Sequence, residues 1–417
     1  MASDQRVIVG VDIGTTKICA LIGEVDENNR LTVVGAGVAP AQGLRKGVVV
    51  DIDDAAASIR TALDQTERIS GYQIGTAFVG IAGQHIMSNN SHGAVAISPQ
   101  KHEVTQHDID RAIEAARAVP VQHNREVLHV IPREYVVDGE DGIRDPLGMS
   151  GYRLEVVTHI VTGAMASIHN LEKSVQKARI EIDDMVLEPM ASGEAVLSQA
   201  ERDLGVALVD IGGGTTDIAI YVHGSVFYSA VLPIGGNHLT NDIAVGLRAP
   251  SHVAEEMKTQ YGSAIAATVE NDEMVEMMTF ENAGAGQVSR RFLCEILEAR
   301  AHELLSMVGE EIKKSGYNGV LPAGIVLTGG SSQLAKLDDL ARGALGMPVR
   351  LGRPEHIQGL SDDFSSPAYA TSVGLLLWGL KNQDLVHAEA RRPADAKEPG
   401  FMSRLSSIFR VFLPQSQ

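Results

Sequence analysis

The sequence is short of cysteine, of positive charge and of long hydrophobic runs, and each shortage excludes a class of protein. The two cysteines, Cys19 and Cys294, form no Cys-x-x-Cys pair, which excludes a disulfide framework or a cysteine metal site and fits a reducing cytoplasm. Acidic residues outnumber basic ones 53 to 35, so we expect no nucleic-acid partner. Apolar runs such as Val373–Leu380 fall far short of the roughly 20 residues that span a bilayer.

The start of the chain also lacks the features of a secretory signal peptide. Its first six residues include Asp4, and the apolar run that follows is short. Hydrophobic residues are plentiful, however, at 44% of the chain, which is ample for buried cores. At about 100–200 residues per domain, the length of 417 residues predicts about two to four domains.

An internal repeat is the most informative feature of the chain. Residues 8–23 read IVGVDIGTTKICALIG and residues 206–223 read VALVDIGGGTTDIAIYVH. In each, an apolar run ends at an aspartate, Asp12 or Asp210, and a Gly and Thr turn leads into a run with alternating apolar side chains. That alternation predicts a β-hairpin, whereas a Rossmann loop or a P-loop leads into a helix, and no G-x-x-x-x-G-K-[ST] motif occurs. We therefore predict two similarly folded halves that face each other.

Glycine-rich turns of this kind suit phosphate, because backbone N–H groups can converge on an anion where no Cβ atom obstructs them. The residues predicted to bind phosphate are Gly14, Thr15, Thr16, Lys17, Gly212, Gly213, Gly214, Thr215 and Thr216. Asp12 and Asp210 stand where they would hold Mg2+ through its waters. Either hairpin alone is equally typical of an ordinary tight turn, but the matched pair and a third Gly-Gly turn in Ile325–Leu334 favour a phosphate site.

The three turns resemble the two phosphate loops and the adenosine loop of the actin, Hsp70 and sugar-kinase superfamily, over about residues 6–380. The resemblance implies an α/β fold with ATP in a cleft between duplicated RNase H-like sheets. It also implies that Leu187–Leu197 and Ala370–Trp378 are the helices that connect the two domains.

The same resemblance assigns further site residues. Glu188 matches the position of the side chain that orients the attacking water, which makes it the candidate general base. The loop that closes over the phosphates matches Gly235, Gly236 and Asn237. The ribose and adenine contacts match Glu256 and Lys258. The adenosine loop matches Gly329, Gly330 and Ser331. The competing interpretations are a capping or surface carboxylate for Glu188, an ordinary strand-to-helix turn at 235–237, and a solvated helix face for Glu256 and Lys258.

An additional segment narrows the resemblance. Residues 131–155, IPREYVVDGEDGIRDPLGMSGYRLE, are similar to a segment of the FtsA family of bacterial cell-division proteins, which carries an inserted subdomain at this place. The implied division is subdomain 1A at 1–83, 163–200 and 365–380; inserted subdomain 1C at 84–162; subdomain 2A at 201–232 and 311–364; subdomain 2B at 233–310; a flexible linker at 381–400; and a tail at 401–417. Within the insertion, Thr105 and Asp108 predict a capping box that opens a helix.

The tail has the pattern of a helix that lies in a membrane interface. At 100° per residue, its apolar side chains fall within an arc of roughly 140°, and arginines and serines occupy most of the rest. The predicted membrane contacts are Phe401, Met402, Leu405, Ile408, Phe409, Phe412 and Leu413. Docking of the same helix on the body of the protein or on a partner is the alternative. One such tail would bind lipid reversibly, and assembly of many chains would make the attachment firm.

Membership of the FtsA family would imply an actin-like ATP-binding protein that self-assembles on the cytoplasmic side of the inner membrane at the division site. It would tether the tubulin-like FtsZ there and help to recruit later division proteins. Arg290, Arg291 and Arg300 would bind the C-terminal peptide of FtsZ, with a solvated basic face as the alternative. Nucleotide would act as a conformational latch that requires no rapid hydrolysis. Two rival functions are a sugar-kinase phosphotransferase and a pilus-assembly actin-like protein.

Overall fold

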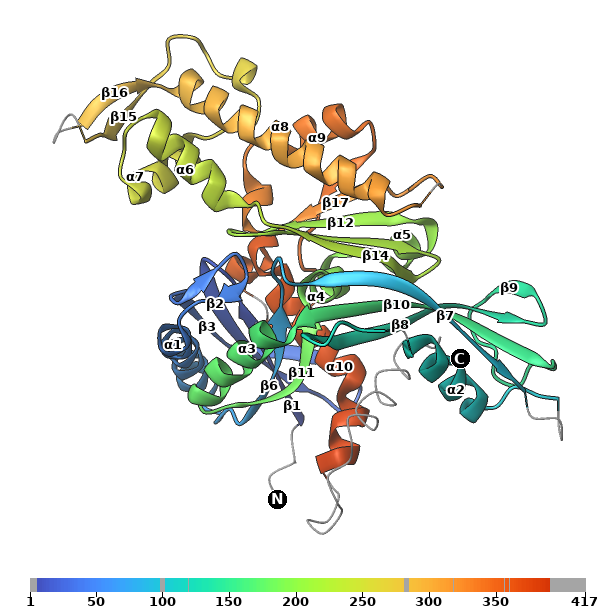
Figure 1. Cartoon of the computed structure of the whole chain (residues 1–417). Coiled ribbons are helices and arrows are strands. Elements are labelled where there is room, and N and C mark those ends of the chain that lie inside the picture. Colours follow the sequence, from blue (N-terminus) through green and yellow to red (C-terminus); the bar gives the residue numbers. More distant parts are fainter. Residues whose placement is uncertain are drawn as a thin grey trace.

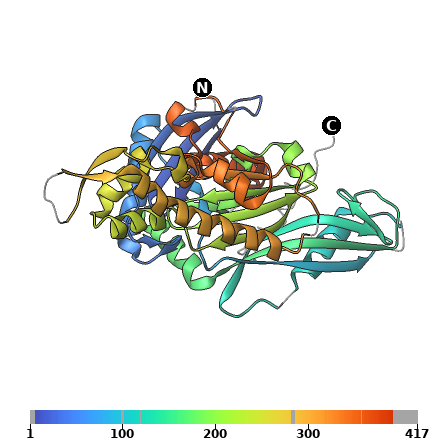
Figure 2. The ribbon, with the colours of Figure 1, turned by 90° about the horizontal axis from the view of Figure 1, so that it is seen from above.

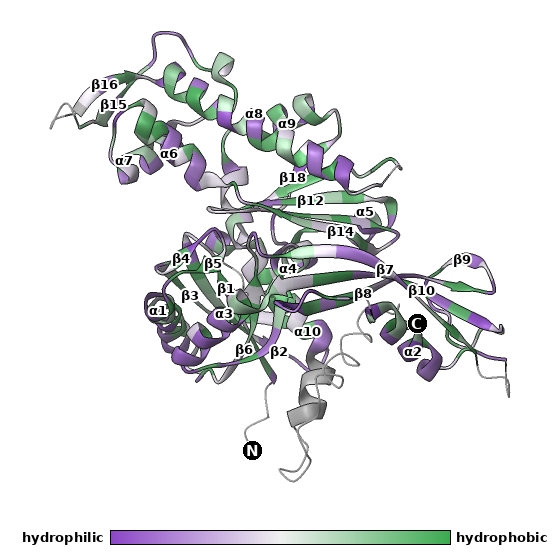
Figure 3. Cartoon of the chain, viewed as in Figure 1, coloured by the Kyte–Doolittle hydropathy of each residue, from purple (hydrophilic) through white to green (hydrophobic). Residues whose placement is uncertain are grey.

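The computed structural model describes residues 6–97, 102–118, 120–280, 285–317, 319–355, 357–359 and 361–390. Two five-stranded sheets form the centres of two α/β domains, and a four-stranded sheet lies beside them (Figure 1). The strands of the two five-stranded sheets are largely hydrophobic (Figure 3), as expected for sheets that are covered by other elements. Among the described residues, no helix combines the length and the hydrophobicity needed to cross a membrane.

The first sheet has the order β11-β6-β1-β2-β3. Its strands are β1 (Arg6–Ile13), β2 (Lys17–Val25), β3 (Leu31–Pro40), β6 (Thr76–Ile81) and β11 (Glu181–Leu187). The register places Gly10 opposite Leu21 and Leu21 opposite Ala36, so these three residues share one face. Gly10 packs against helix α10 (Ala370–Ala390), whereas Gly37, next to Ala36, packs against helix α1 (Ile52–Ser70). The two helices therefore cover opposite faces, and helix α3 (Met165–Lys177) lies beside α1.

The second sheet has the order β14-β13-β12-β17-β18. Its strands are β12 (Val206–Ile211), β13 (Thr216–Val222), β14 (Ser225–Leu232), β17 (Ile325–Thr328) and β18 (Val349–Leu351). In both sheets an antiparallel hairpin, β1-β2 or β12-β13, is joined to a parallel strand, β6 or β17. The predicted duplication is therefore confirmed at the level of strand pairing. Helices α5 (Gln199–Leu204), α8 (Arg290–Lys314) and α9 (Leu337–Leu345) pack around this sheet.

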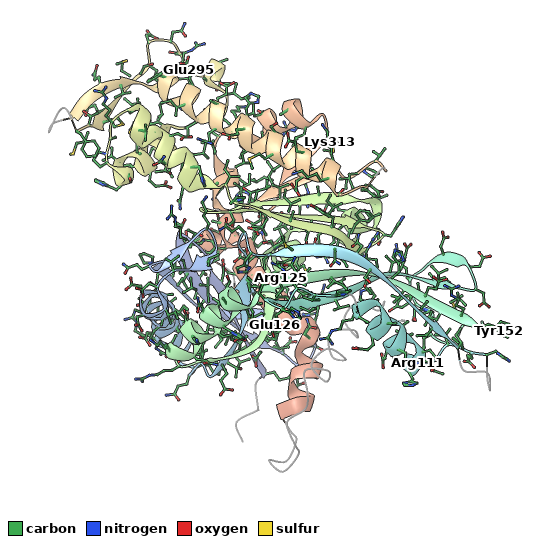
Figure 4. The ribbon with its side chains drawn as sticks, in the orientation of Figure 1. Arg111, Arg125, Glu126, Tyr152, Glu295 and Lys313 are labelled. Atoms are coloured by element: carbon green, nitrogen blue, oxygen red, sulfur yellow. The ribbon has the colours of Figure 1, made fainter. Side chains whose placement is uncertain are left out.

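The inserted segment forms an antiparallel sheet of its own, with the order β7-β10-β8-β9. Its strands are β7 (Met87–Ala96), β8 (Arg125–Val137), β9 (Glu140–Ile143) and β10 (Arg153–Ala164), covered by helix α2 (Gln106–Arg117). The predicted capping box is present, since Thr105 and Asp108 each accept a hydrogen bond from the other's backbone N–H. Figure 4 shows Tyr152 at the far end of this sheet and Arg125 near its junction with the first domain.

A smaller unit stands above the second sheet. It contains helices α6 (Gly236–Gly246) and α7 (Ser251–Tyr261), the short helix η1 (Ala266–Thr268) and a hairpin of β15 (Met274–Met278) and β16 (Ala285–Ser289). Helix α8 begins in this unit and continues unbroken to Lys314, past the predicted boundary at 310. Figure 4 labels Glu295 in its first half and Lys313 near its end. Seen from above, the unit lies at the opposite end of the molecule from the insertion (Figure 2).

Two helices connect the domains. Helix α4 (Glu188–Val196) and helix α10 cross at Gly374, where a Cβ atom would overlap the backbone of Ala191. The prediction of a flexible linker at 381–400 is wrong for residues 381–390, because these residues continue α10. A helix already nucleated extends at little cost, and the Asn382 side chain holds this turn by donating to Trp378 O over 2.8 Å. The rest of the predicted linker and the predicted tail, 391–417, lie outside the described residues.

Candidate nucleotide-binding site

The two repeated turns have the same internal geometry and face each other. Gly14 N–H donates to Lys17 O over 3.1 Å, and Gly212 N–H donates to Thr215 O over 3.0 Å, so equivalent hydrogen bonds close the two turns. A Cβ atom at Gly214 would lie 2.6 Å from Thr15 Oγ1. The turns of the two domains are therefore in contact, and glycine is required for this close approach.

Two further loops pack on the second turn. Gly236 N–H donates to Gly212 O over 2.9 Å, and Asn237 N–H donates to Gly213 O over 2.8 Å. From the third glycine turn, Ser331 Oγ donates to Gly212 O over 3.0 Å. These contacts come from the start of α6 and from the short helix η2 (Gly330–Gln333), so four segments far apart in sequence meet at one place. This is the arrangement that the sequence motifs predict.

Gly329 and Gly235 lie where only glycine fits. Gly329 has φ +84°, which favours glycine, and a Cβ atom there would overlap Asp210 Oδ1. At Gly235 a Cβ atom would lie 2.7 Å from Gly212 O. Gly330 is less restricted, since its nearest neighbour would be 3.7 Å away.

The four predicted threonines are used differently. Thr15 Oγ1 accepts from Gly47 N–H over 3.0 Å, in the turn between β4 (Leu44–Arg45) and β5 (Val48–Val49), and Thr16 is exposed. Thr215 Oγ1 donates to Asp217 Oδ2 over 2.9 Å. Thr216 is fully buried, and its hydroxyl donates to Ile234 O over 2.8 Å, so it stabilises the loop before α6. The Thr15 and Thr16 side chains are therefore better placed than Thr216 to face a ligand.

Lys17 contacts the segment just before helix α10. Its Nζ donates to Ala368 O over 2.6 Å and lies 3.2 Å from the ring centroid of Tyr369, in the short helix η4 (Pro367–Tyr369). Burial lowers the pKa of Lys17, although the Asp12 carboxylate opposes that shift. A phosphate oxygen in the site would offer this amine a second negative partner.

Helix α7 contributes Lys258, and the acidic residue beside it is Glu255. Lys258 Nζ donates to Thr240 Oγ1 over 2.9 Å, to Glu255 Oε2 over 2.7 Å and to Gly236 O over 3.3 Å. Glu256 is exposed on the other side of the helix and accepts from Gln260 Nε2 over 3.2 Å. The structure therefore brings Lys258 to the loop at 235–237 and leaves Glu256 away from it, and Glu255 is the residue that sequence reasoning missed.

Buried carboxyls gather beneath the turns. Asp12 and Asp210 are each 7% exposed and Asp217 is 2% exposed. Burial raises the pKa of all three, to about 6 for Asp210 and about 8 for Asp217, and repulsion from Asp210 adds to the shift at Asp217. Asp217 Oδ1 has no hydrogen-bond partner. A divalent cation would stabilise such a group of carboxyls by favouring their charged forms.

The residues present fit a Mg2+ ion that is held mainly by water and phosphate. Within the described ranges, no three His, Cys, Asp or Glu side chains converge closely enough to form a metal cage. Mg2+ commonly keeps several waters and takes few protein carboxylates together with substrate phosphates, which matches two aspartates below the turns. Bound there, the ion would neutralise phosphate charge.

Glu188 is the first residue of α4. Burial raises its pKa well above the usual value, and the charges of Asp12, Asp217 and Asp210 raise it further. A carboxyl with these neighbours differs from the surface carboxylate of the competing interpretation. Its role as general base stays a prediction, and it requires the charged form, which a nearby cation would favour.

The buried carboxyls should make the nucleotide-free protein less stable as the pH rises. The folded-state pKa of Asp217, about 8, exceeds its ordinary value of 3.8, so the stabilisation it contributes is complete below about pH 4 and is lost as the pH rises through 8. We expect the thermal unfolding midpoint to decrease as the pH is raised from about 5 to 9. In Asp217→Asn this decrease should be smaller. Asp141→Asn, at an exposed site, is the control; an equally steep decline in Asp217→Asn contradicts the prediction.

The arginines predicted to bind a peptide already have partners. Arg290 Nη1 pairs with Glu273 Oε1 over 2.7 Å, and Arg291 Nη1 contacts Asn271 Oδ1. Arg300 binds Asp242 with two nitrogens, over 2.5 and 3.0 Å. An acidic peptide would have to compete with these contacts. Exposed apolar side chains of the same small unit are Val245, Met274, Met278, Phe280 and Phe292.

The paired sheets, their facing glycine turns and the buried aspartates define an actin-like fold with a candidate nucleotide site. A family model described as "Cell division protein FtsA" matches residues 207–374, and one described as "SHS2 domain inserted in FTSA" matches residues 83–162. The cell division protein FtsA of Pseudomonas aeruginosa is 47% identical over 385 residues, which are 92% of this chain and 92% of that protein. The chain belongs to the FtsA family of cell-division proteins.

Solved structures agree on the fold. A chain of the PilM-PilN type IV pilus biogenesis complex aligns with TM-score 0.65 and 17% identity, covering 89% of this chain and 98% of that one. MreB5 of Spiroplasma citri bound to ADP aligns with TM-score 0.53 and 12% identity, covering 93% and 99%. At these identities the likeness shows the fold alone, so the pilus-assembly rival gains nothing from it. The predicted actin-like fold and the FtsA resemblance are confirmed.

Proposed function

We propose that this division protein binds Mg2+-ATP between its two domains, self-assembles on the cytoplasmic side of the inner membrane at the division site, and tethers FtsZ there. The observation that supports the nucleotide step most strongly is the contact between the two phosphate-type turns, which are residues 14–17 and 212–216, above buried Asp12 and Asp210. MreB5 of Spiroplasma citri, an actin-like neighbour, was solved bound to ADP, which supports the same use of the fold.

Nucleotide would act as a latch between the domains. The phosphate-type turns belong to different sheets, so a ligand that contacts both favours one relative orientation of the domains. That orientation would decide whether surfaces of neighbouring chains fit, and so whether the protein assembles. Binding alone is enough for such a latch, and Glu188 is the proposed base for slow hydrolysis.

Attachment to the membrane is assigned to the tail at 401–417, on the strength of its sequence pattern. With an acidic body, the chain would be repelled by anionic lipid unless the tail held it there. For FtsZ, the proposed contacts of its C-terminal peptide are Arg290, Arg291 and Arg300, together with the exposed apolar side chains around them. Later division proteins would be recruited by the assembled state.

Co-sedimentation with anionic liposomes tests this proposal. We expect the full chain to bind more lipid with Mg2+-ATP than without it, and a chain ending at Pro399 to bind almost none. Phe409→Glu with Phe412→Glu should abolish lipid binding and leave ATP affinity unchanged, because the charged side chains cannot enter the apolar interface. The matched control, Phe409→Leu with Phe412→Leu, should still bind. Lipid binding that survives truncation refutes the tail as anchor.

A further inference from the structure

Hydroxyl groups from both connecting helices hold the two aspartates of the candidate site. Ser192 Oγ, in α4, donates to Asp210 Oδ2 over 2.5 Å, and Thr371 Oγ1, in α10, lies 3.2 Å from the same oxygen. Ser372 Oγ, also in α10, donates to Asp12 Oδ2 over 2.9 Å. The Ser192 and Thr371 hydroxyls are 2.9 Å apart. Asp210 is therefore held by hydroxyls from both helices, and Asp12 by a hydroxyl from α10.

These hydroxyls are removed from water. Ser192 and Ser372 are fully buried and Thr371 is 7% exposed, so their hydroxyls depend on protein partners, among which are the two carboxylates. A hydrogen bond to a charged group is stronger than one between neutral groups, and it fixes the direction of the carboxylate. These hydrogen bonds therefore determine how Asp12 and Asp210 are oriented.

The orientation leaves one oxygen of each aspartate directed to the glycine turns. The hydroxyls occupy the Oδ2 atoms. Asp210 Oδ1 lies against Gly329, where no Cβ atom would fit, and Asp12 Oδ1 is 3.9 Å from the position of a Cβ atom on Gly14. The oxygens that the hydroxyls do not use therefore lie beside glycine turns: Asp12 Oδ1 beside the first turn, at Gly14, and Asp210 Oδ1 beside the third, at Gly329.

We propose that Ser192, Thr371 and Ser372 are positioning residues that orient Asp12 and Asp210 toward the hydrated Mg2+ of bound nucleotide. This inference rests on the proposed ATP binding. Because the hydroxyls belong to the helices that cross between the domains, a rotation of α4 against α10 changes the direction of the carboxylates. Metal binding and domain orientation are coupled through these three side chains.

The test compares affinity for a fluorescent ATP analogue in Mg2+ and in EDTA, with Mg2+ titrated at fixed analogue concentration. Ser192→Ala and Ser372→Ala should raise the Mg2+ concentration for half-maximal binding by about ten-fold and change the affinity in EDTA by less than about two-fold. Thr371→Val should behave similarly, whereas Thr371→Ser, which keeps the hydroxyl, should match the parent. Ser174→Ala is the matched control, since that serine is buried in α3 and donates to Asn170 O.

A purely structural role for the hydroxyls predicts a different result. Thermal unfolding midpoints would then fall, and affinity would change equally in Mg2+ and in EDTA. That pattern, or an unaltered Mg2+ dependence in all three variants, overturns the inference. If an alanine variant fails to fold, the comparison of Thr371→Val with Thr371→Ser still tests the inference. Absence of analogue binding by the parent chain would refute the proposed nucleotide function itself and this role with it.

Discussion

Asp210→Ala is expected to weaken Mg2+-ATP binding by about 10–100-fold, the range seen when groups that support a metal site are removed. Asp210 is 7% exposed at the end of β12, and its Oδ1 lies beside Gly329 in the third glycine turn. The variant removes a negative charge that would be paired with the cation, so its effect should be largest when Mg2+ is present. Isothermal titration with ATP in Mg2+ and in EDTA measures both affinities.

Two variants separate loss of charge from loss of packing. Asp210→Asn keeps the shape and can still accept from Ser192, so a loss of Mg2+-dependent affinity there is electrostatic. Asp339→Ala makes the same change at an exposed residue of α9, where Asp339 pairs with Lys336 and Arg342, and it should leave ATP affinity unchanged. Equal affinities for Asp210→Ala and the parent in Mg2+ would remove this residue from the site.

The parts of the fold that carry a local pattern were predictable from the sequence. Each phosphate-type hairpin is marked by an aspartate, a glycine turn and alternating apolar residues, and both are present as β1-β2 and β12-β13. The capping box at Thr105 and Asp108 is equally local. Such signals depend on neighbours within about ten residues, so one sequence contains them completely.

Other features depend on contacts between distant segments. Ser192 and Thr371 are ordinary small polar residues in two helices, and only the crossing of α4 and α10 brings them to Asp210. Glu255 and Glu256 are neighbours in α7, and consecutive residues of a helix point in different directions. The Glu255 side chain therefore reaches Lys258, whereas that of Glu256 faces solvent. The continuation of α10 through 381–390 was missed because weak apolar periodicity does not end a helix that has already begun.

Glu194→Ala is expected to lower the free energy of unfolding by about 3–5 kcal/mol, the cost of leaving a buried charge without its partner. Glu194 Oε1 pairs with Arg202 Nη1 over 2.7 Å, and both side chains are 10% exposed. Its other oxygen contacts Lys381 Nζ in α10. Burial alone would raise the pKa of Glu194, but the charges of Arg202 and Lys381 lower it below the usual value, so the carboxylate is charged.

Urea unfolding followed by tryptophan fluorescence measures this effect, because the single tryptophan, Trp378, lies in α10 one turn before Lys381 and is 1% exposed. Asp53→Ala is the control: it removes an exposed pair with Lys177 and should cost about 0–1 kcal/mol.

Glu194→Leu with Arg202→Met removes both charges, and it should recover most of the loss, since apolar residues can replace a buried ion pair. A Glu194→Ala effect no larger than that of Asp53→Ala would mean that Arg202 needs no carboxylate, and its bond to Gly193 O over 2.7 Å would then be sufficient.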